Sequence, residues 1–318
     1  TDDSPIYICG LARSGTTIVL RVLDQLESLV SLSYRDMPFV MAPNLWSRTS
    51  RMNMREATLL ERAHGDGMEV GYDSPEAFEE IFWQTYCEPN RCSSVCYGLT
   101  EPSAEVLSDF AEYRQLVVRS RNKSLSDYKT RRYVSKNNNN LTRLPYLLKQ
   151  RTASIVLVYR DPIETARSLH SQHQRFLARQ NKDGFTLQYM KWLGHHEFGL
   201  GYKPFCFAVN SQITTLKTDT VEYWLAYWNA IYRYVLDQKS EQILLTHHDS
   251  MRAEPEKFLI NLFQRLELEA DAFELSKEIK PQVTANKAIP EDISPKIIES
   301  AYVTYRSLLS DLRNVLVT

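Results

Sequence analysis

The stretch GLARSGTT at residues 10–17 follows directly on the apolar run IYIC. A phosphate-binding loop of the Walker type has the pattern G-x-x-x-x-G-K-[ST] between a strand and a helix. Gly10, Gly15 and Thr17 occupy three of its four fixed places. Thr16 stands where the pattern has a lysine. The sequence therefore predicts a strand, an anion-binding loop and a helix, and the missing lysine needs an explanation.

The composition is that of an ordinary globular chain. Of its 318 residues 43% are hydrophobic, which is ample for a packed core. The formal net charge of −1 gives no overall positive field, so we expect no nucleic-acid partner and only a local anion site. No apolar run approaches the roughly 20 residues that span a bilayer. We expect a cytoplasmic protein, and because the chain does not begin with methionine, a leader or anchor ahead of it stays an open alternative.

Alternating strand and helix patterns predict the fold class. The runs RYVSK (132–136), SIVLVYR (154–160) and QILLTHHD (242–249) are typical of strands buried in a parallel sheet. After the second run, Asp161 and Pro162 are expected to begin a helix as N-cap and first helical residue. We therefore predict an α/β fold with a P-loop-like, doubly wound parallel sheet flanked by helices. Ligands of such sheets bind at the carboxyl ends of the strands.

The loop keeps the features of an anion site without its lysine. In nucleotide triphosphatases that lysine neutralises the β- and γ-phosphates beside a magnesium ion. Here Arg13 supplies a cation, and Ser14 and Thr16 add hydroxyls beside the N–H groups of a helix N-terminus. Such a loop suits a phosphate whose neighbour is a transferred or leaving group. A P-loop kinase is the weaker alternative, because the sequence also offers no convincing Walker B aspartate.

Two motifs give the chain a family resemblance. IYICGLARSGTTIVLRVLD resembles the 5′-phosphosulfate loop of sulfotransferases that use 3′-phosphoadenosine 5′-phosphosulfate (PAPS), in which a basic residue precedes Ser-Gly-Thr-Thr. IVLVYRDPIETARS resembles the 3′-phosphate site of the same family, with Arg160 at a strand end and Ser168 in the next helix. The two motifs together, in the family's order, are far more specific than either alone.

The resemblance extends to two further segments. YVSKNNNNLTRLPYLL resembles the segment K-x-P-x-N-L-x-R-L-P-x-L of the tyrosylprotein-type and related bacterial branch, with Lys136 at its lysine. ILLTHHDSMRAEPEKFL resembles a later element, in which a Tyr-Glu-Asp run precedes a helix that starts with proline. His247, His248 and Asp249 occupy that run here, which is a departure in side chains.

The resemblance implies a single sulfotransferase domain over residues 1–318. Its nucleotide-binding core is expected at about residues 5–30 and 130–270. Helical insertions at about residues 37–130 and 181–240, where the resemblance fades, are expected to form the acceptor region.

The implied reaction is the in-line transfer of a sulfuryl group from PAPS to an acceptor hydroxyl, which leaves 3′-phosphoadenosine 5′-phosphate (PAP). Such a transfer needs positioning, cations on the developing charge and a base, and it requires no metal. The expected partner is a small-molecule or glycan acceptor. A nucleotide-binding protein without catalysis is a second alternative, against which the intact set of basic residues argues.

The resemblance also implies a role for each site residue. Arg13 is expected on the leaving phosphate. Lys136 is expected to hold the bridging oxygen or to act as a general acid. The residues expected to bind the nucleotide are Arg13, Ser14, Gly15, Thr16, Thr17, Arg160 and Ser168.

The base is expected to be Asp36, in LVSLSYRDMPF. The tyrosylprotein-type branch has a glutamate at nearly this distance from the arginine of the loop, and Asp36 could instead cap a turn before Pro38. His170 and His173 lie one turn apart on the helix of Ser168 and are the alternatives, although such histidines are more often structural. The pair His195-His196 is a weaker case.

Five cysteines give no metal motif. Cys87, Cys92 and Cys96 in TYCEPNRCSSVCYG do not have a common zinc spacing, and no histidine is near. We expect scattered thiols or one local disulfide there, and no metal site.

Overall fold

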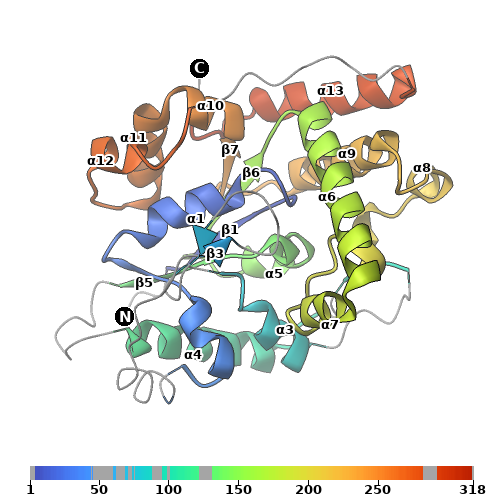
Figure 1. The fold of residues 1–318 in the computed structure, drawn as a ribbon. Coiled ribbons are helices and arrows are strands. Elements are labelled where there is room, and N and C mark those ends of the chain that lie inside the picture. Colours follow the sequence, from blue (N-terminus) through green and yellow to red (C-terminus); the bar gives the residue numbers. More distant parts are fainter. Residues whose placement is uncertain are drawn as a thin grey trace.

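A five-stranded parallel sheet forms the centre of the protein (Figure 1). The computed structural model describes residues 4–43, 45, 60–61, 69–70, 74, 76–87, 95–98, 101–121, 131–281 and 292–316. The strands are β1 (Ile6–Gly10), β2 (Leu29–Val30), β5 (Arg132–Lys136), β6 (Ser154–Tyr159) and β7 (Ile243–His247), in the order β2-β5-β1-β6-β7. All neighbouring strands are parallel, so the four runs predicted as strands are confirmed. A separate antiparallel pair consists of β3 (Leu60–Glu61) and β4 (Glu69–Val70).

The helices follow the predicted alternation. Up to residue 192 they are α1 (Thr16–Asp24), α3 (Glu80–Tyr86), α4 (Ala104–Ser120), α5 (Leu144–Leu147), α6 (Pro162–Lys182) and α7 (Gly184–Trp192). After residue 192 they are α8 (Ser211–Thr215), α9 (Val221–Asp237), α10 (His248–Ala253), α11 (Pro255–Leu266), α12 (Ala272–Ser276) and α13 (Pro295–Leu309). The 3-10 helices are η1 (Tyr34–Phe39), η4 (Asn138–Arg143), η5 (Gly199–Gly201) and η6 (Cys206–Ala208).

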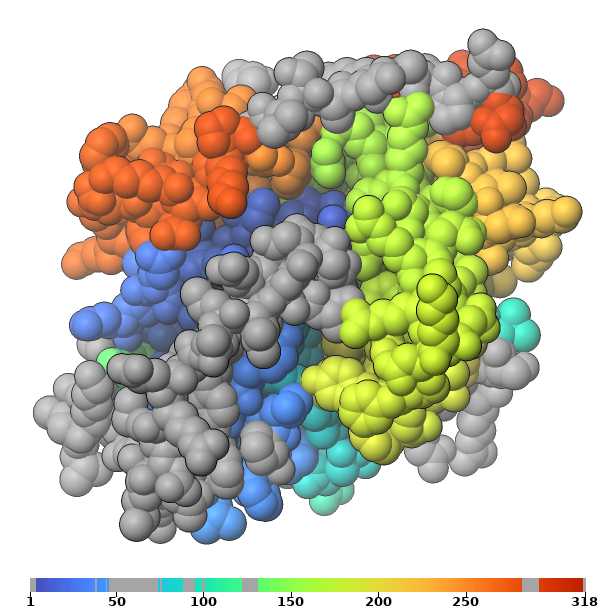
Figure 2. All heavy atoms as spheres, viewed as in Figure 1, coloured from blue at the N-terminus to red at the C-terminus, as the bar shows by residue number. Residues whose placement is uncertain are grey.

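Helices cover both faces of the sheet. Successive side chains of a strand point to opposite faces, so one strand contributes to the hydrophobic contacts on both sides. Ile6 and Ile8 of β1 belong to a hydrophobic cluster with α1 and α11. Tyr7 and Cys9 of the same strand belong to a second cluster, with α3, α4, α6 and α9. On the face seen in Figure 2, α6 and α7 form one continuous side, and α10 to α12 lie at the upper left. The predicted α/β class is confirmed, and the single-domain organisation stays a prediction.

Strand order places the phosphate loop where ligands are expected. From β1 the chain continues to β2 and β5 on one side of the sheet, and after β6 it continues to β7 on the other side. The carboxyl end of β1 is therefore the switch point of the sheet, outside which ligands bind. At the neighbouring strand end, Asp161 caps α6 by accepting a hydrogen bond of 3.0 Å from the N–H of Glu164, and Pro162 begins the helix as predicted.

The two predicted insertions contain helices in their described parts. Residues 181–240 contain α7, η5, η6, α8 and α9. The described residues between 37 and 130 include α3, α4 and the β3–β4 pair. α9 packs on α6 and on α13, so the second insertion lies against the helix that follows β6.

Candidate active site

The phosphate loop joins β1 to α1 through two positions that require glycine. Gly10 has φ 152°, and a Cβ there would lie 2.4 Å from the carbonyl oxygen of Val158. Gly15 has φ 102°, and a Cβ there would lie 2.5 Å from Cδ2 of His248. Arg13, between them, has φ 70°, which is rare for a residue with a side chain. Strained backbone of this kind is often found at ligand sites.

The loop presents the donors of an anion site. Gly15 is the N-cap of α1 and supplies no side-chain acceptor, so the first N–H groups of the helix are left for another partner. Oγ of Ser14 is buried and donates to the carbonyl oxygen of Leu11 at 2.7 Å. Oγ1 of Thr16 donates to Oδ1 of Asn138 at 3.4 Å. A helix N-terminus with these features binds phosphate readily.

Arg13 connects the two sequence motifs. Its Nε donates to Oγ of Ser168 in α6 at 3.1 Å, although the two residues are 155 positions apart. The loop that was predicted for the 5′-phosphate and the serine that was predicted for the 3′-phosphate thus lie in contact. This contact places both motifs at one edge of the sheet.

Arg160 lies at the end of β6 between two carboxylates. Its Nη2 donates to Glu164, and its Nε lies 3.8 Å from Oδ1 of Asp249. The Nε atom is buried and has no hydrogen bond within the described structure. Buried donors nearly always have a partner, so this orphan N–H is a place where a bound oxygen would fit.

His248 and Asp249 pack against the loop from the end of β7. Nδ1 of His248 donates to Oδ1 of Asp249 at 2.9 Å. Burial lowers the pKa of His248, so this imidazole is neutral at pH 7. Burial would raise the pKa of Asp249, but the hydrogen bond from His248 and nearby positive charge, that of Arg160 included, outweigh it, and that pKa is lowered. The His-His-Asp run therefore supports Gly15 and faces Arg160.

Lys136 ends β5, beside β1 and the loop. The register pairs it with Ile8, and the next residue, Asn137, donates its N–H to the carbonyl oxygen of Ile8 at 2.9 Å. A charged pair is close to it, in which Nδ1 of His195 lies 3.4 Å from Oε1 of Glu197. No sequence pattern marks Glu197, because the loop that carries it has no helical or strand periodicity.

A small cavity lies between the phosphate loop and α9. Its volume is about 20 Å³. Leu11 and Ala12 of the loop line it together with Glu197. Several aromatic side chains of the second insertion and of the segment before α4 form other parts of the wall, namely Tyr97, Tyr202, Phe205, Trp224 and Tyr227.

Asp36, the predicted base, is held by its own helix and by α4. Its Oδ2 accepts hydrogen bonds from the N–H of Ser33 at 2.8 Å and from Arg121. The reciprocal bonds between Ser33 and Asp36 form the capping box of η1. Oδ1 is buried and has no hydrogen bond in the part of the chain that the structure describes. The alternative role of Asp36 as a cap is therefore present, and its role as a base stays a prediction.

The two histidines of α6 have structural partners. His173 is buried, and its Nδ1 accepts a hydrogen bond of 3.2 Å from the N–H of Gly199. Burial lowers the pKa of His173 to about 4, so the ring is neutral. Nε2 of His170 bonds with the carbonyl oxygen of Asp219 at 2.8 Å. Both rings tie α6 to the second insertion.

A network of buried charges joins the first insertion to the sheet, and it was not predicted. Glu80 of α3 accepts hydrogen bonds from Arg143 and from Nδ2 of Asn137, the latter at 2.7 Å. Glu79 accepts from Nδ2 of Asn140 at 2.8 Å. Arg143, Glu79 and Glu80 are each 1% exposed. Two asparagines of the NNNN tract, Asn137 and Asn140, are therefore amide partners of buried carboxylates.

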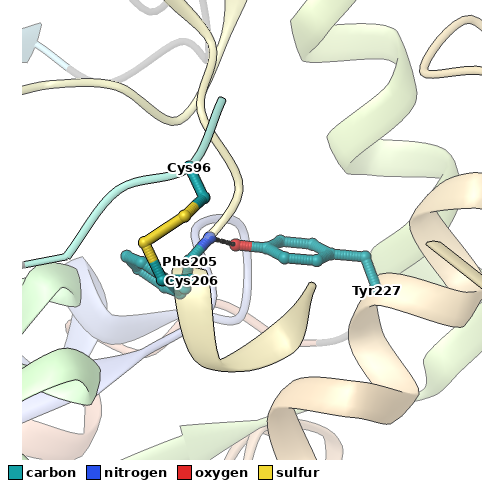
Figure 3. The surroundings of a disulfide bond; sticks show 4 residues. All are labelled: Cys96, Phe205, Cys206 and Tyr227. Carbon is teal, nitrogen blue, oxygen red and sulfur yellow. Dashed lines mark hydrogen bonds between the residues drawn. A yellow bond between two sulfur atoms is a disulfide. The ribbon is translucent and has the colours of Figure 1, made fainter. Parts of the chain in front are cut away.

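A disulfide joins the two insertions (Figure 3). Cys96 pairs with Cys206, 110 positions later, so the expected local disulfide is wrong in its span. Cys87 is buried as a thiol, and Cys92 lies outside the described residues. The N–H of Phe205, beside the disulfide, donates to the hydroxyl of Tyr227 at 3.0 Å. Such pairs are rare in the cytosol, and the cytoplasmic location stays a prediction.

Removal of this disulfide should destabilise the protein. We expect the double variant Cys96→Ala/Cys206→Ala to lose about 2–4 kcal/mol of unfolding free energy, because a long loop of the unfolded chain is no longer closed. Urea titrations followed by circular dichroism would measure it. Dithiothreitol should lower the unfolding free energy of the wild type and leave that of the double variant unchanged. An equal change in both proteins would contradict the pairing. Cys87→Ala is the control for losing a buried thiol.

The described residues contain no group of three or more histidine, cysteine, aspartate or glutamate side chains that could hold a metal ion. Within the same residues, no helix combines the length and apolarity needed to cross a membrane.

Comparison with known proteins identifies the family. A family model described as the sulfotransferase family matches residues 5–272. Sulfotransferase STF9 from Mycobacterium avium has a TM-score of 0.50 at 14% identity, covering 98% of this chain and 77% of that chain. Sulfotransferase STF1 from Mycobacterium tuberculosis H37Rv has a TM-score of 0.45 at 16% identity, covering 87% and 71%. No curated protein matches the chain. Since the family model matches more than half of its length, the chain belongs to the sulfotransferase family.

Proposed function

We propose that this protein transfers a sulfuryl group from PAPS to an acceptor hydroxyl by in-line displacement. The observation that carries the proposal is the hydrogen bond between Arg13 and Ser168, which brings the two expected phosphate sites together. PAPS supplies an activated sulfuryl group on its 5′-phosphate, and its 3′-phosphate distinguishes it from other nucleotides.

The residues present fit this donor. The uncapped N–H groups of α1, with Ser14, Gly15, Thr16 and Thr17, suit a 5′-phosphate. The guanidinium of Arg13 beside them suits the charge that develops on the leaving phosphate. The buried, unpartnered Nε of Arg160 suits an oxygen of the 3′-phosphate, which would share Arg160 with Glu164.

Lys136 is the proposed second cation at the reacting centre. It ends β5 next to the loop, and a lysine there can stabilise the bridging oxygen or protonate it. Asp36 remains the sequence-based candidate for the base. No metal has a part in this proposal.

The proposed acceptor is a small molecule or a glycan that presents a hydroxyl group. The second insertion contributes much of the cavity beside the loop, including several aromatic side chains. A volume of about 20 Å³ admits a hydroxyl group but not a whole sugar or phenol ring, so the acceptor is assigned here by its reacting group alone.

Nucleotide binding is the first test of the proposal. We expect PAP to raise the melting temperature of the wild type in the absence of metal, because a ligand that binds only the folded state stabilises it. Arg160→Ala should weaken this stabilisation, and Arg265→Ala, an exposed arginine of α11, should not. Stabilisation by ATP with magnesium but not by PAP would overturn the proposal.

A further inference from the structure

The cavity beside the phosphate loop contains one carboxylate, Glu197, among its described lining residues. Leu11 and Ala12 of the loop form another part of the same wall. The volume of about 20 Å³ holds a group of the size of a water molecule or a hydroxyl. A small polar group in this cavity would therefore lie between the loop and a carboxylate.

The backbone before Glu197 is fixed to the residues that follow Lys136. Nδ2 of Asn139 donates to the carbonyl oxygen of Gly194 at 3.1 Å. Gly194 has φ 72°, and a Cβ there would lie 2.5 Å from Cγ of Glu80, so the turn is closely packed. Glu197 thus keeps a defined position relative to the end of β5, where the reacting centre is proposed.

Positive charges hold Glu197 in its ionised form. Burial alone would raise its pKa, but the charge and hydrogen bond of His195 and the charge of Lys136 lower it to about 2. His195 in turn faces Glu197, Glu76 and Lys136, and its pKa is raised by the two carboxylates although burial opposes this. At neutral pH the cavity therefore presents a carboxylate, a proton acceptor.

Asp36 is less accessible to an acceptor than Glu197. Its side chain is 1% exposed, against 19% for Glu197. The Oδ2 atom is engaged by Ser33 and Arg121, and the Oδ1 atom is buried. A hydroxyl could reach Asp36 only if the cap of η1 opened.

We propose that Glu197 receives the proton of the acceptor hydroxyl. This inference rests on the proposed sulfuryl transfer. In the step, the acceptor oxygen forms a bond to sulfur while the bond between sulfur and the 5′-phosphate oxygen breaks. The electron pair of the broken bond stays on the phosphate oxygen, and the acceptor proton passes to the carboxylate of Glu197.

A weakly basic carboxylate is sufficient for this transfer. An oxygen that keeps its proton while it bonds to sulfur becomes a strong acid, so the proton leaves late and needs an acceptor in place rather than a strong base. The position of Glu197 in the cavity meets that need, and Lys136 keeps its proposed role at the leaving oxygen.

The test compares acceptors of different acidity in Glu197→Gln and in the wild type. The probes are water and a series of phenols from 4-methoxyphenol to 4-nitrophenol, with PAPS as donor and PAP release as readout. We expect Glu197→Gln to lose turnover by about 10²- to 10⁴-fold with the weakly acidic acceptors. The loss should shrink toward 4-nitrophenol, whose proton is already gone at mildly alkaline pH. Damage to packing alone would lower the turnover with all acceptors by the same factor.

Three variants complete the comparison. Glu256→Gln, an exposed glutamate of α11, should match the wild type. Glu197→Asp should turn over more slowly and keep the wild-type dependence of turnover on acceptor acidity. This variant replaces Glu197→Gln in the test if Glu197→Gln does not fold. Asp36→Asn should keep that dependence as well. Wild-type turnover of Glu197→Gln with every probe, or an acidity-dependent loss in Asp36→Asn alone, would overturn the inference in favour of Asp36.

Failure of the proposed function gives a different result. In that case the wild type neither binds PAP nor releases it from PAPS with any probe. If the wild type binds PAP and consumes PAPS while Glu197→Gln does the same at an equal rate, only the assignment of Glu197 fails.

Discussion

Replacing Arg13 with alanine is expected to lower the turnover of sulfuryl transfer by about 10²- to 10³-fold, the usual cost of removing one donor from a preorganised charge-stabilising site. Arg13 is the cation of a loop that lacks the Walker lysine, so few other groups can take over its charge. Its backbone φ of 70° and its hydrogen bond to Ser168 hold the guanidinium in place before a ligand arrives. The effect should therefore lie mainly in kcat.

The measurement is the initial rate of PAP release from PAPS, beside PAP binding by calorimetry. Arg13→Lys tests geometry, because a lysine keeps the charge and loses the planar fork that matches phosphate. Arg265→Ala on the exposed side of α11 controls for the loss of one positive charge. If the turnover of Arg13→Ala fell by less than tenfold, Arg13 would have a structural role at the loop. Lys136 would then stabilise the charge on the leaving phosphate.

Sequence patterns predicted the nucleotide half of the site because its information is local. Strand periodicity located β1, β5, β6 and β7, and the carboxyl ends of parallel strands share one edge. Arg13, Lys136 and Arg160, which the family resemblance singled out, agree with that rule, since each lies at or shortly after a strand end. The contact of Arg13 with Ser168 then agrees with the order of the two motifs.

The contacts of the proposed acceptor half could not be predicted, because they join residues far apart in the chain. Cys96 is paired across 110 positions, although the local cysteine spacing suggested nearby partners. Glu197 gains its significance from the loop residues across the cavity, and no periodic pattern marks it. Asp36 was chosen by its distance along the sequence from Arg13, which does not reveal that Arg121 of the following insertion engages it.

The buried charges of α3 and η4 are the clearest case of such a hidden dependence. Arg143 pairs with Glu80, donates from Nε to Oδ1 of Asn140 at 3.2 Å, and places its guanidinium carbon 4.8 Å from the ring centre of Trp83. We expect Arg143→Met to lose about 3–5 kcal/mol of unfolding free energy, because Glu80 is left buried without its cation. Urea unfolding followed by circular dichroism measures the loss.

A double-mutant cycle separates the ion pair from packing. If the stranded charge of Glu80 is the cause, Glu80→Gln combined with Arg143→Met should lose clearly less than the sum of the two single losses. Strictly additive losses would instead assign the cost to the stacking of Arg143 on Trp83. In the first case the first insertion and the sheet depend on each other through charge, since Glu80 belongs to α3 and Arg143 to the segment that follows Lys136. A mutation in the proposed acceptor region would then disturb Lys136, the proposed catalytic lysine, without contacting it.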